Sequence, residues 1–374
     1  MKILAIESSC DETSAAIVET GSSPQSVKVL SNVTATSMAI HAGTGGIIPE
    51  NAAREQIKFI IPVIREALLN IDINFDNETI QHLNNAERFK LSNNILKNEI
   101  DAIAVTHGPG LIGSLLVGVE TAKTLSLLFN KPVIPVHHLL AHLFANFIEP
   151  TINHKPSTIN HKLSAISYPL IGLIVSGGHT DLLLFESSSK FKWLGGTRDD
   201  AAGEALDKIG RLLNLPYPSG PEIERRASLV KDPRSGIKFQ SPMINSPDFD
   251  FSFSGLKSEA TRFISGKSLT NELTNQICHS LQTAIFDVLV KKTVQAAEKY
   301  NVQNILTGGG VSANQTLHEY LNYSIARSGL KIKVFTPEKQ YSTDNAAMIG
   351  AYALINYKPE KWNRVIARPE LYFA

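Results

Sequence analysis

Apolar residues follow two alternating patterns along the chain, short unbroken runs and longer stretches with helical spacing. Three short runs read as buried strands: residues 3–6, 102–106 and 304–307. Three longer segments carry helical apolar spacing: residues 51–69, 111–129 and 270–297. Strands that alternate with helices predict an α/β fold whose sheets are largely buried.

One strand–turn–strand pattern occurs twice. Residues 3–18 consist of an apolar run, a polar turn and a second apolar run, and residues 170–185 repeat this order. Two such hairpins, each at the head of one half of the chain, predict a duplicated α/β architecture. Turns crowded with backbone amides and hydroxyl groups also suit a phosphate-bearing ligand.

The chain has 374 residues, which is too long for one compact domain. We expect a first domain of residues 1–133 plus 350–374, and a second domain of residues 134–349. Residues 73–98, rich in Asn and charge, and residues 151–168 are expected to be inserted surface segments. The second segment contains a polar near-repeat with two histidines but no acidic ligand, so a surface loop is favoured over a metal site.

Composition narrows the class of protein. A hydrophobic content of 43% excludes a disordered chain, and two cysteines exclude a disulfide scaffold or a thiol-rich metal cage. The formal net charge is only +1, so any RNA binding must use a local patch or a partner protein. The N-terminal segment reaches an acidic residue, Glu7, too early for the apolar region of a secretory signal. No apolar run approaches the ~20 residues of a membrane span. We therefore expect a soluble cytoplasmic protein with no membrane partner.

The sharpest local signal is a pair of histidines. On a helix, His138 and His142 share one face, whereas His137 points away from both. Two imidazoles on one face form half of a divalent-metal site, but two partly buried histidines on an amphipathic helix fit the pattern equally well. A zinc-peptidase helix has a Glu directly after its first His, and here Leu139 stands there, which disfavours peptidase chemistry.

A metal would need a third ligand, and Asp344 offers a carboxylate beside small residues at an expected helix start. Two His and one Asp leave coordination positions open for substrate oxygens and suit Fe(II) or Zn(II). The alternative for Asp344 is a plain helix N-cap.

Three glycine-bearing turns, at 176–180, 217–221 and 308–314, are candidate nucleotide contacts, although each alone is a weak signal. In the last turn, the Asn314 amide could read an adenine or a ribose. Among nearby acids, Asp207 could hold ribose hydroxyls or the amine of the substrate. Asp199 and Asp200 are expected to cap a helix or to lie on a solvated face.

Seven motifs occur in a characteristic order: residues 6–13, 41–54, His138 with His142, 175–180, 251–257, 309–314 and 343–345. Together they resemble the universal tRNA threonylcarbamoyladenosine transferase family, which comprises bacterial TsaD and its mitochondrial relatives. The resemblance implies the two-lobed actin-like, sugar-kinase and heat-shock ATPase superfamily fold, with duplicated RNase H-like lobes. It also implies transfer of a threonylcarbamoyl group from threonylcarbamoyl-AMP to N6 of adenosine 37 in tRNAs that read ANN codons.

The resemblance assigns roles to individual residues. His138, His142 and Asp344 would bind one divalent metal ion per subunit, with iron expected and zinc as the alternative, and Asp11 and Glu12 would serve catalysis. The acyl-adenylate would be contacted by Ile174, Val175, Ser176, Gly177, Gly178, Asp207, Gly220, Glu224 and Asn314. Ser219 departs from the family pattern, in which many relatives carry Gly, so the shape of that turn is an open question.

The adenine N6 amine is a poor nucleophile, because its lone pair is delocalised into the ring, and the mixed anhydride with AMP supplies the activation that the implied reaction needs. Either Asp11 or Glu12 could accept the amine proton. The implied partners are tRNA and, in a bacterial-type complex, an inactive paralogous subunit and a small ATPase; a mitochondrial-type protein would be a homodimer. Two rival functions are an actin-like ATPase that acts as a chaperone or scaffold, and, less favoured, a metallopeptidase.

Overall fold

The computed structural model describes residues 1–23, 25–36, 48–71, 82–150, 166–230 and 236–373. Its internal contacts divide the chain into a first unit, Met1–Ala165 with Thr343–Ala374, and a second unit, Ile166–Ser342. The polar near-repeat at 151–164 and part of the motif at 41–54 lie outside the described residues.

The first unit is built on a mixed sheet with the strand order β3-β2-β1-β4-β5. The first three strands form an antiparallel meander, and the last two run parallel to β1. The strands are β1 (Lys2–Glu7), β2 (Glu12–Thr20), β3 (Val27–Thr36), β4 (Ala102–Gly108) and β5 (Val133–His137). The helices are α2 (Pro49–Leu69), α4 (Asn85–Asn98), α5 (Ile112–Phe129), α6 (His138–Phe144), η1 (Ala145–Phe147), α13 (Ala346–Ile355) and η4 (Trp362–Arg364).

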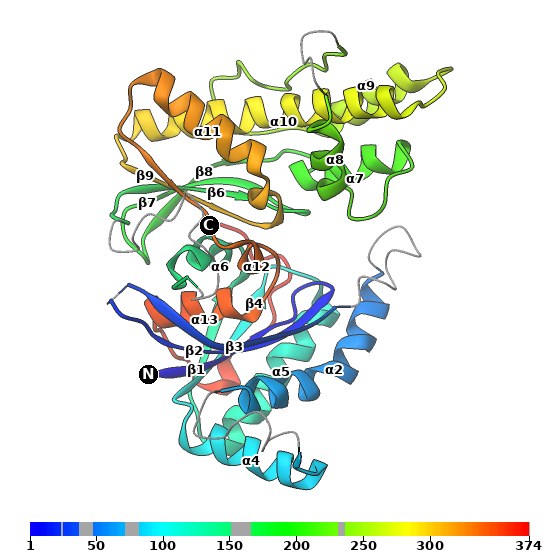
Figure 1. The fold of residues 1–374 in the computed structure, drawn as a ribbon. Helices are drawn as coiled ribbons and strands as arrows, with labels where there is room; N and C mark the ends of the chain where they lie inside the picture. The colour runs from blue at the N-terminus through cyan, green and yellow to red at the C-terminus, as the bar shows by residue number, and fades with distance from the viewer. Residues whose placement is uncertain (24, 37–47, 72–81, 151–165, 231–235, 374) are drawn as a thin grey trace. The chain divides into compact units, whose positions relative to one another are not determined.

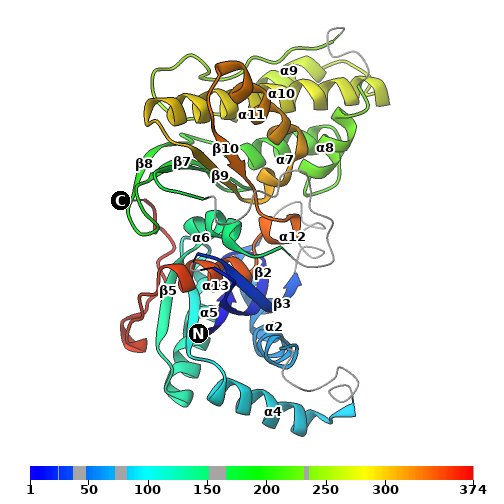
Figure 2. The ribbon, with the colours of Figure 1, turned by 60° about the vertical axis from the view of Figure 1, so that its left-hand side comes forward.

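Alternation along β1 places helices on both faces of this sheet. Leu4 and Ile6 are fully buried in one apolar cluster with residues of α2 and α5. Ala5 points the other way, toward α13, where a Cβ on Gly350 would lie 3.3 Å from the Ala5 Cβ. Figures 1 and 2 accordingly show α13 on the face opposite to α2 and α5. The period of two in the sequence thus gives a sheet buried on both sides.

The second unit repeats the design, with the strand order β10-β9-β6-β7-β8. Again three antiparallel strands are followed by two parallel ones, which confirms the expected duplication. The strands are β6 (Leu170–Val175), β7 (Thr180–Phe185), β8 (Phe191–Gly196), β9 (Asn304–Gly308) and β10 (Lys333–Phe335). The helices are α7 (Ala202–Leu212), α8 (Gly220–Ala227), α9 (Ser254–Ile264), α10 (Asn271–Lys299), η3 (Gly310–Ala313), α11 (Gln315–Ser328) and α12 (Lys339–Ser342). Helices α10 and α11 lie side by side in both ribbon views.

The division between the units differs from the expected one, which fell at 133/134 and 349/350. Residues 134–137 belong to the first unit because β5 pairs with β4, and α13 belongs there because it packs on β1 and β2. The chain therefore returns to the first unit at Thr343 and not at residue 350. The expected second domain, 134–349, also held His138, His142 and Asp344 together, and the structure places all three in the first unit instead.

Part of the expected insertion at 73–98 is a regular helix. Asn84 accepts from the backbone N–H groups of Ala86 and Glu87, and the Glu87 carboxylate accepts from the Asn84 N–H, which is a capping box. Ile95 and Leu96 are buried in the core of the first unit. Sequence pattern alone did not indicate this helix, because two buried apolar residues are too few to show a helical period.

Helix α5 has 18 residues and a mean hydropathy of 1.4, so by length and composition it is able to cross a membrane. The helical spacing at 111–129 predicted this helix, but the sequence analysis did not note it as a candidate span, because Glu120 and Lys123 interrupt the apolar run. In the structure these two side chains form an ion pair at 2.8 Å, and the buried side of the helix packs against α2 and β4. A helix that packs into a protein core also meets this criterion of length and hydropathy.

Candidate metal centre and nucleotide-contacting turns

Two histidines and one aspartate meet in the first unit. His138 and His142 lie one turn apart on α6, are 6% and 1% exposed, and have ring centroids 4.8 Å apart. Their Nε2 atoms lie 3.6 and 3.2 Å from Asp344 Oδ1. One ligand atom from each of the three residues falls within 4.8 Å of the others, which is a spacing that one metal ion could bridge.

His137 takes no part in this group. It ends β5 and precedes α6, and its ring stacks on Phe373 with a centroid distance of 5.1 Å. The three-residue group therefore consists of the helical pair and the distant aspartate, as the helical spacing predicts.

The reading of Asp344 as the N-cap of a helix is wrong. Asn345 is the N-cap of α13, and its side chain accepts from the Met348 N–H at 3.1 Å. The next residue, Ala346, donates its N–H to Ser14 Oγ at 3.0 Å, which fixes the start of α13 against β2. Because Asn345 performs the capping, the Asp344 carboxylate lies instead beside the two imidazoles.

Several carboxylates surround the histidines. Burial by itself lowers the pKa of His138, but Glu7 and Asp344 outweigh it and raise that pKa to about 9. Burial, a hydrogen bond to Asp11 and the charge of Asp344 raise the pKa of Glu12 to about 10. Asp11 lies in the turn between β1 and β2, and Glu12 is the first residue of β2. A cluster of acids that penalise one another's charge favours binding of a cation.

Glu7 is the member of this cluster that the sequence analysis missed. It is fully buried at the end of β1, and its Oε2 lies 3.1 Å from His138 Nδ1. The signal that could have found it is a carboxylate at the end of an otherwise apolar strand, since a charge there needs partners.

In the second unit, two glycine-bearing segments approach the glycine-bearing turn after β6. Ser176 accepts from the Gly203 N–H at 3.2 Å, and a Cβ on Gly203 would lie 2.6 Å from Ser176 O. Gly309 has φ +93°, and a Cβ there would lie 2.5 Å from Val175 O. Among the described residues, no atom lies within 4 Å of a Cβ on Gly177 or Gly178. The starts of α7 and η3 can approach this turn so closely only because glycine has no side chain.

The expected adenylate contacts differ in how much of each side chain is available. Ile174 and Val175 are fully buried in β6, so only their backbone groups could meet a ligand. Asp207 Oδ1 accepts from the Ser219 N–H at 2.6 Å, and burial is the main cause that raises the pKa of this carboxyl. Ser219 has φ −86°, which any residue adopts, and it fits because Gly210 leaves room for its side chain. The turn therefore does not require glycine at 219, and Gly220 follows it as the first residue of α8.

Asn314 and Glu224 support the start of α11. The Asn314 side chain accepts from the N–H groups of Thr316 and Leu317 and donates to Gln282 Oε1 at 3.1 Å. Glu224 Oε1 accepts from the Gln315 N–H at 2.9 Å. Asn314 is thus a helix cap first, and its amide has little left with which to read a base.

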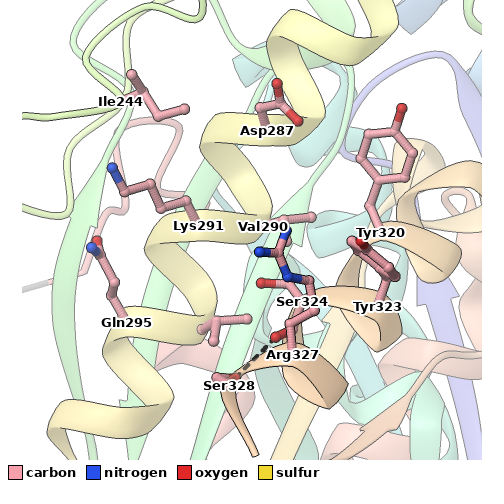
Figure 3. A pocket seen from close by; sticks show the side chains of 11 residues that line it. Ile244, Asp287, Val290, Lys291, Gln295, Tyr320, Tyr323, Ser324, Arg327 and Ser328 are labelled. Atoms are coloured by element: carbon pink, nitrogen blue, oxygen red, sulfur yellow. Dashed lines mark hydrogen bonds between the residues drawn. The ribbon is translucent and has the colours of Figure 1, made fainter.

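A groove of about 790 Å³ in the second unit contains none of these residues. It lies between α10 and α11, and Figure 3 shows Lys291 and Arg327 among its lining side chains. Arg327 lies 5.7 Å from the Tyr323 ring centroid, and Lys291 donates to Asn245 Oδ1 at 2.9 Å.

Two units with the same strand order define the two-lobed α/β fold of the actin-like, sugar-kinase and heat-shock ATPase superfamily. Among solved structures, HypF from T. kodakarensis has a TM-score of 0.58 at 13% identity, with 95% of this chain and 48% of that chain aligned. Such a likeness shows the fold alone.

Sequence comparison shows the family. The model of the TsaD family, tRNA N6-adenosine threonylcarbamoyltransferase, matches residues 28–80 and 78–351. Curated proteins of that name are 41% identical over 357 residues in Moorella thermoacetica and 40% identical over 358 residues in Lacticaseibacillus casei, each match spanning 95% of this chain and 92% of the relative. The chain belongs to the tRNA N6-adenosine threonylcarbamoyltransferase family, and it is therefore a transferase that acts in tRNA modification.

Proposed function

We propose that the chain transfers the threonylcarbamoyl group of L-threonylcarbamoyl-AMP to N6 of adenosine 37 in tRNAs that read ANN codons. The observation that carries this proposal is the family match at about 40% identity over 95% of the chain. The family name does not specify the donor molecule, the position in the tRNA or the codon class. These three parts of the proposal rest on the motif resemblance.

His138, His142 and Asp344 would hold one divalent metal ion, which we propose to be Fe²⁺, with Zn²⁺ as the alternative. The residues present fit such an ion. Both ring nitrogens of His142 are buried and accept or donate no hydrogen bond within the described part of the chain. Two imidazoles and one carboxylate are a donor set that Fe(II) and Zn(II) share. When bound, the metal would supply positive charge that polarises the carbamoyl oxygen or neutralises the leaving phosphate.

Asp11 would accept the proton of the attacking amine. In the reaction, a bond forms between N6 and the carbamoyl carbon, the bond from that carbon to the phosphate oxygen breaks, and AMP leaves. The hydrogen bond between Glu12 and Asp11, with the pKa of Glu12 at about 10, supports Asp11 as the acceptor, because Glu12 then already holds a proton. Glu12 would orient Asp11.

In the second unit, the turn at Ser176–Gly178 would contact the adenylate phosphate through backbone groups, because Gly177 and Gly178 leave open space above it. Asp207 would hold the ribose hydroxyls with the carboxylate oxygen that does not accept from Ser219. Gly220 and Asn314 would complete the contacts through backbone atoms, and Glu224 would act through the segment it supports.

The chain would act in the cytoplasm with tRNA, an inactive paralogous subunit and a small ATPase. The matching relatives named above are bacterial, which supports this bacterial-type set over a homodimer. The rival reading as an ATPase scaffold is not favoured by the family match, and the metallopeptidase reading lacks a base beside His138.

Transfer of labelled threonylcarbamoyl-AMP to a tRNA transcript tests the proposal, with purified chain and its two protein partners. We expect label in a transcript with adenosine at position 37 and none in the matched transcript with guanosine there. Equal labelling of both transcripts, or of neither, would contradict the proposed acceptor.

A further inference from the structure

A fully buried carboxylate ends the central strand of the first unit. Glu7 is 0% exposed, and its neighbours on β1 are apolar residues of the core. A carboxylate in such a place is costly unless every oxygen is matched by donors. The Glu7 carboxylate therefore needs hydrogen-bond donors or a positive charge beside it to offset the cost of its burial.

Three groups face Glu7, and all three can donate. Oε1 accepts from the Ser9 N–H at 2.5 Å, and Oε2 accepts from Thr106 Oγ1 at 2.5 Å. Oε2 also lies 3.1 Å from His138 Nδ1. The backbone turn and the β4 hydroxyl hold the carboxylate in place, and the remaining contact is with the candidate metal ligand.

The contact with Glu7 gives the two ring nitrogens of His138 different partners. Nδ1 faces Glu7 and carries a proton toward it, so the lone pair of the neutral ring lies on Nε2. Nε2 is the atom that faces Asp344, at 3.6 Å. A carboxylate–imidazole pair of this kind fixes both the tautomer and the plane of a metal-binding ring.

We infer that Glu7 is a positioning residue of the metal centre, which holds the His138 ring with Nε2 directed at the ion and adds a buried negative charge behind it. The inference rests on the proposed function only in so far as His138, His142 and Asp344 bind a divalent cation. In this assignment Glu7 is not one of the three ligands.

The substitution Glu7→Gln tests this assignment with little change of volume. The amide NH₂ of glutamine must replace one carboxylate oxygen. At the Oε1 position it would meet the Ser9 N–H, which cannot become an acceptor. At the Oε2 position it would meet His138 Nδ1, which can accept only if the ring proton moves to Nε2, and that nitrogen could then no longer bind a metal. Both orientations weaken the site.

The experiment is a titration of metal-free protein with Co²⁺ alone, followed by the visible absorption of the bound ion. We expect Glu7→Gln to lower the affinity about 10- to 100-fold. At saturating Co²⁺ we also expect an altered spectrum, because the ring is no longer held in one plane. A residue that only supports folding would leave the spectrum at saturation unchanged.

Glu149→Gln is the matched control. Glu149 is also in the first unit and accepts from Ser22 and Ser26, but it is not part of the acidic cluster. This variant should bind Co²⁺ like the wild type, and circular dichroism should show that both variants are folded. Folded Glu7→Gln with wild-type affinity and spectrum would overturn the inference while leaving the metal centre intact. Failure of the wild type itself to bind Co²⁺ would overturn both the metal centre and the role of Glu7.

Discussion

His142 Nε2 lies 3.2 Å from Asp344 Oδ1, although His142 belongs to α6 and Asp344 immediately precedes the last long helix of the chain. The pair exists because the chain returns to the first unit at Thr343 and α13 packs on the sheet there. An ion at this point would tie α6 to the start of α13. Disruption of the His142–Asp344 pair should therefore lower both the metal content and the stability of the first unit.

The first prediction concerns the three ligands. Replacing His138, His142 or Asp344 with Ala should lower the bound metal to well below one equivalent and abolish threonylcarbamoyl transfer, because two remaining ligands bind a divalent ion loosely. Elemental analysis of the purified variants measures the metal, and the transfer assay measures the activity.

His137→Ala is the control for this set, since its ring stacks on Phe373 and lies outside the ligand group. It should keep the metal. Stoichiometric metal and full activity in Asp344→Ala would show that the aspartate is not a ligand.

The second prediction concerns Asp199, which caps a helix far along the chain. Its carboxylate accepts from the Ser252 hydroxyl at 2.6 Å, the Phe253 N–H at 2.8 Å and the Ser254 hydroxyl at 2.7 Å, at the start of α9. Asp199→Ala should lower the free energy of unfolding by about 1 kcal/mol. Urea unfolding at pH 7 measures the difference from the wild type.

This difference should depend on pH. Burial opposes the shift, but the hydrogen bonds from Ser252 and Ser254 hold the pKa of Asp199 below its ordinary value. A lowered pKa means that the stabilisation is complete above the unfolded-state pKa and is lost as pH falls through the folded-state value. The gap between wild type and Asp199→Ala should therefore shrink as pH falls below 3.8, the ordinary pKa of an aspartate. The difference between Asp199→Asn and Asp199→Ala should not change with pH. A gap that is constant with pH would contradict the charged cap.

A third prediction follows from the close approach of Gly203 to the turn after β6. An alanine Cβ there would lie 2.6 Å from Ser176 O and 2.8 Å from Gly177 Cα, and neither backbone atom can move without reshaping the turn. Gly203→Ala should cost about 1–3 kcal/mol of stability and weaken binding of the adenylate. Gly255→Ala is the control, because a Cβ there has no atom within 4 Å, and it should be neutral or stabilising. Equal stability of the two variants would refute the close approach.

The repeated pattern of apolar runs and polar turns predicted the fold well. Both hairpins form as antiparallel pairs, and the apolar strands are buried on both faces, because hydrophobic period and turn composition act locally. Helical spacing also predicted that His138 and His142 share a face. The residue contacts proposed for the adenylate and for catalysis stay predictions.

Other features depend on partners distant in sequence and could not be read from local pattern. The burial of Glu7 is matched by donors on β4 and α6, which no spacing rule connects to β1. Asn314 looked available to a ligand, but the orphan N–H groups of α11 occupy its carbonyl oxygen. Asn345 and Asp344 are adjacent, and only the direction of α13 decides which one caps the helix.

The last prediction uses Cys10 as a reporter of the acidic cluster. Burial raises the pKa of the Cys10 thiol, and the carboxylates of Asp344 and Asp11 raise it further. Removing one of these charges should lower the thiol pKa and increase the thiolate fraction, about tenfold for each pKa unit at pH 8. In a Cys278→Ser background, metal-free Asp344→Asn should therefore react faster with a thiol reagent than the protein with Asp344 intact.

Cys278 provides the control, because burial is the main cause that raises its pKa to about 12, and the charges acting on it are those of Arg226 and Glu222. In a Cys10→Ser background, Asp344→Asn should leave the slow labelling of Cys278 unchanged, while urea should expose the one remaining thiol of each background. The measurement is the rate of thiol modification at pH 8 under native conditions. An unchanged Cys10 rate in Asp344→Asn would show that the Asp344 charge does not act on Cys10. Acceleration at Cys278 alone would indicate loosened packing in place of electrostatics, because burial is the main cause that protects that thiol.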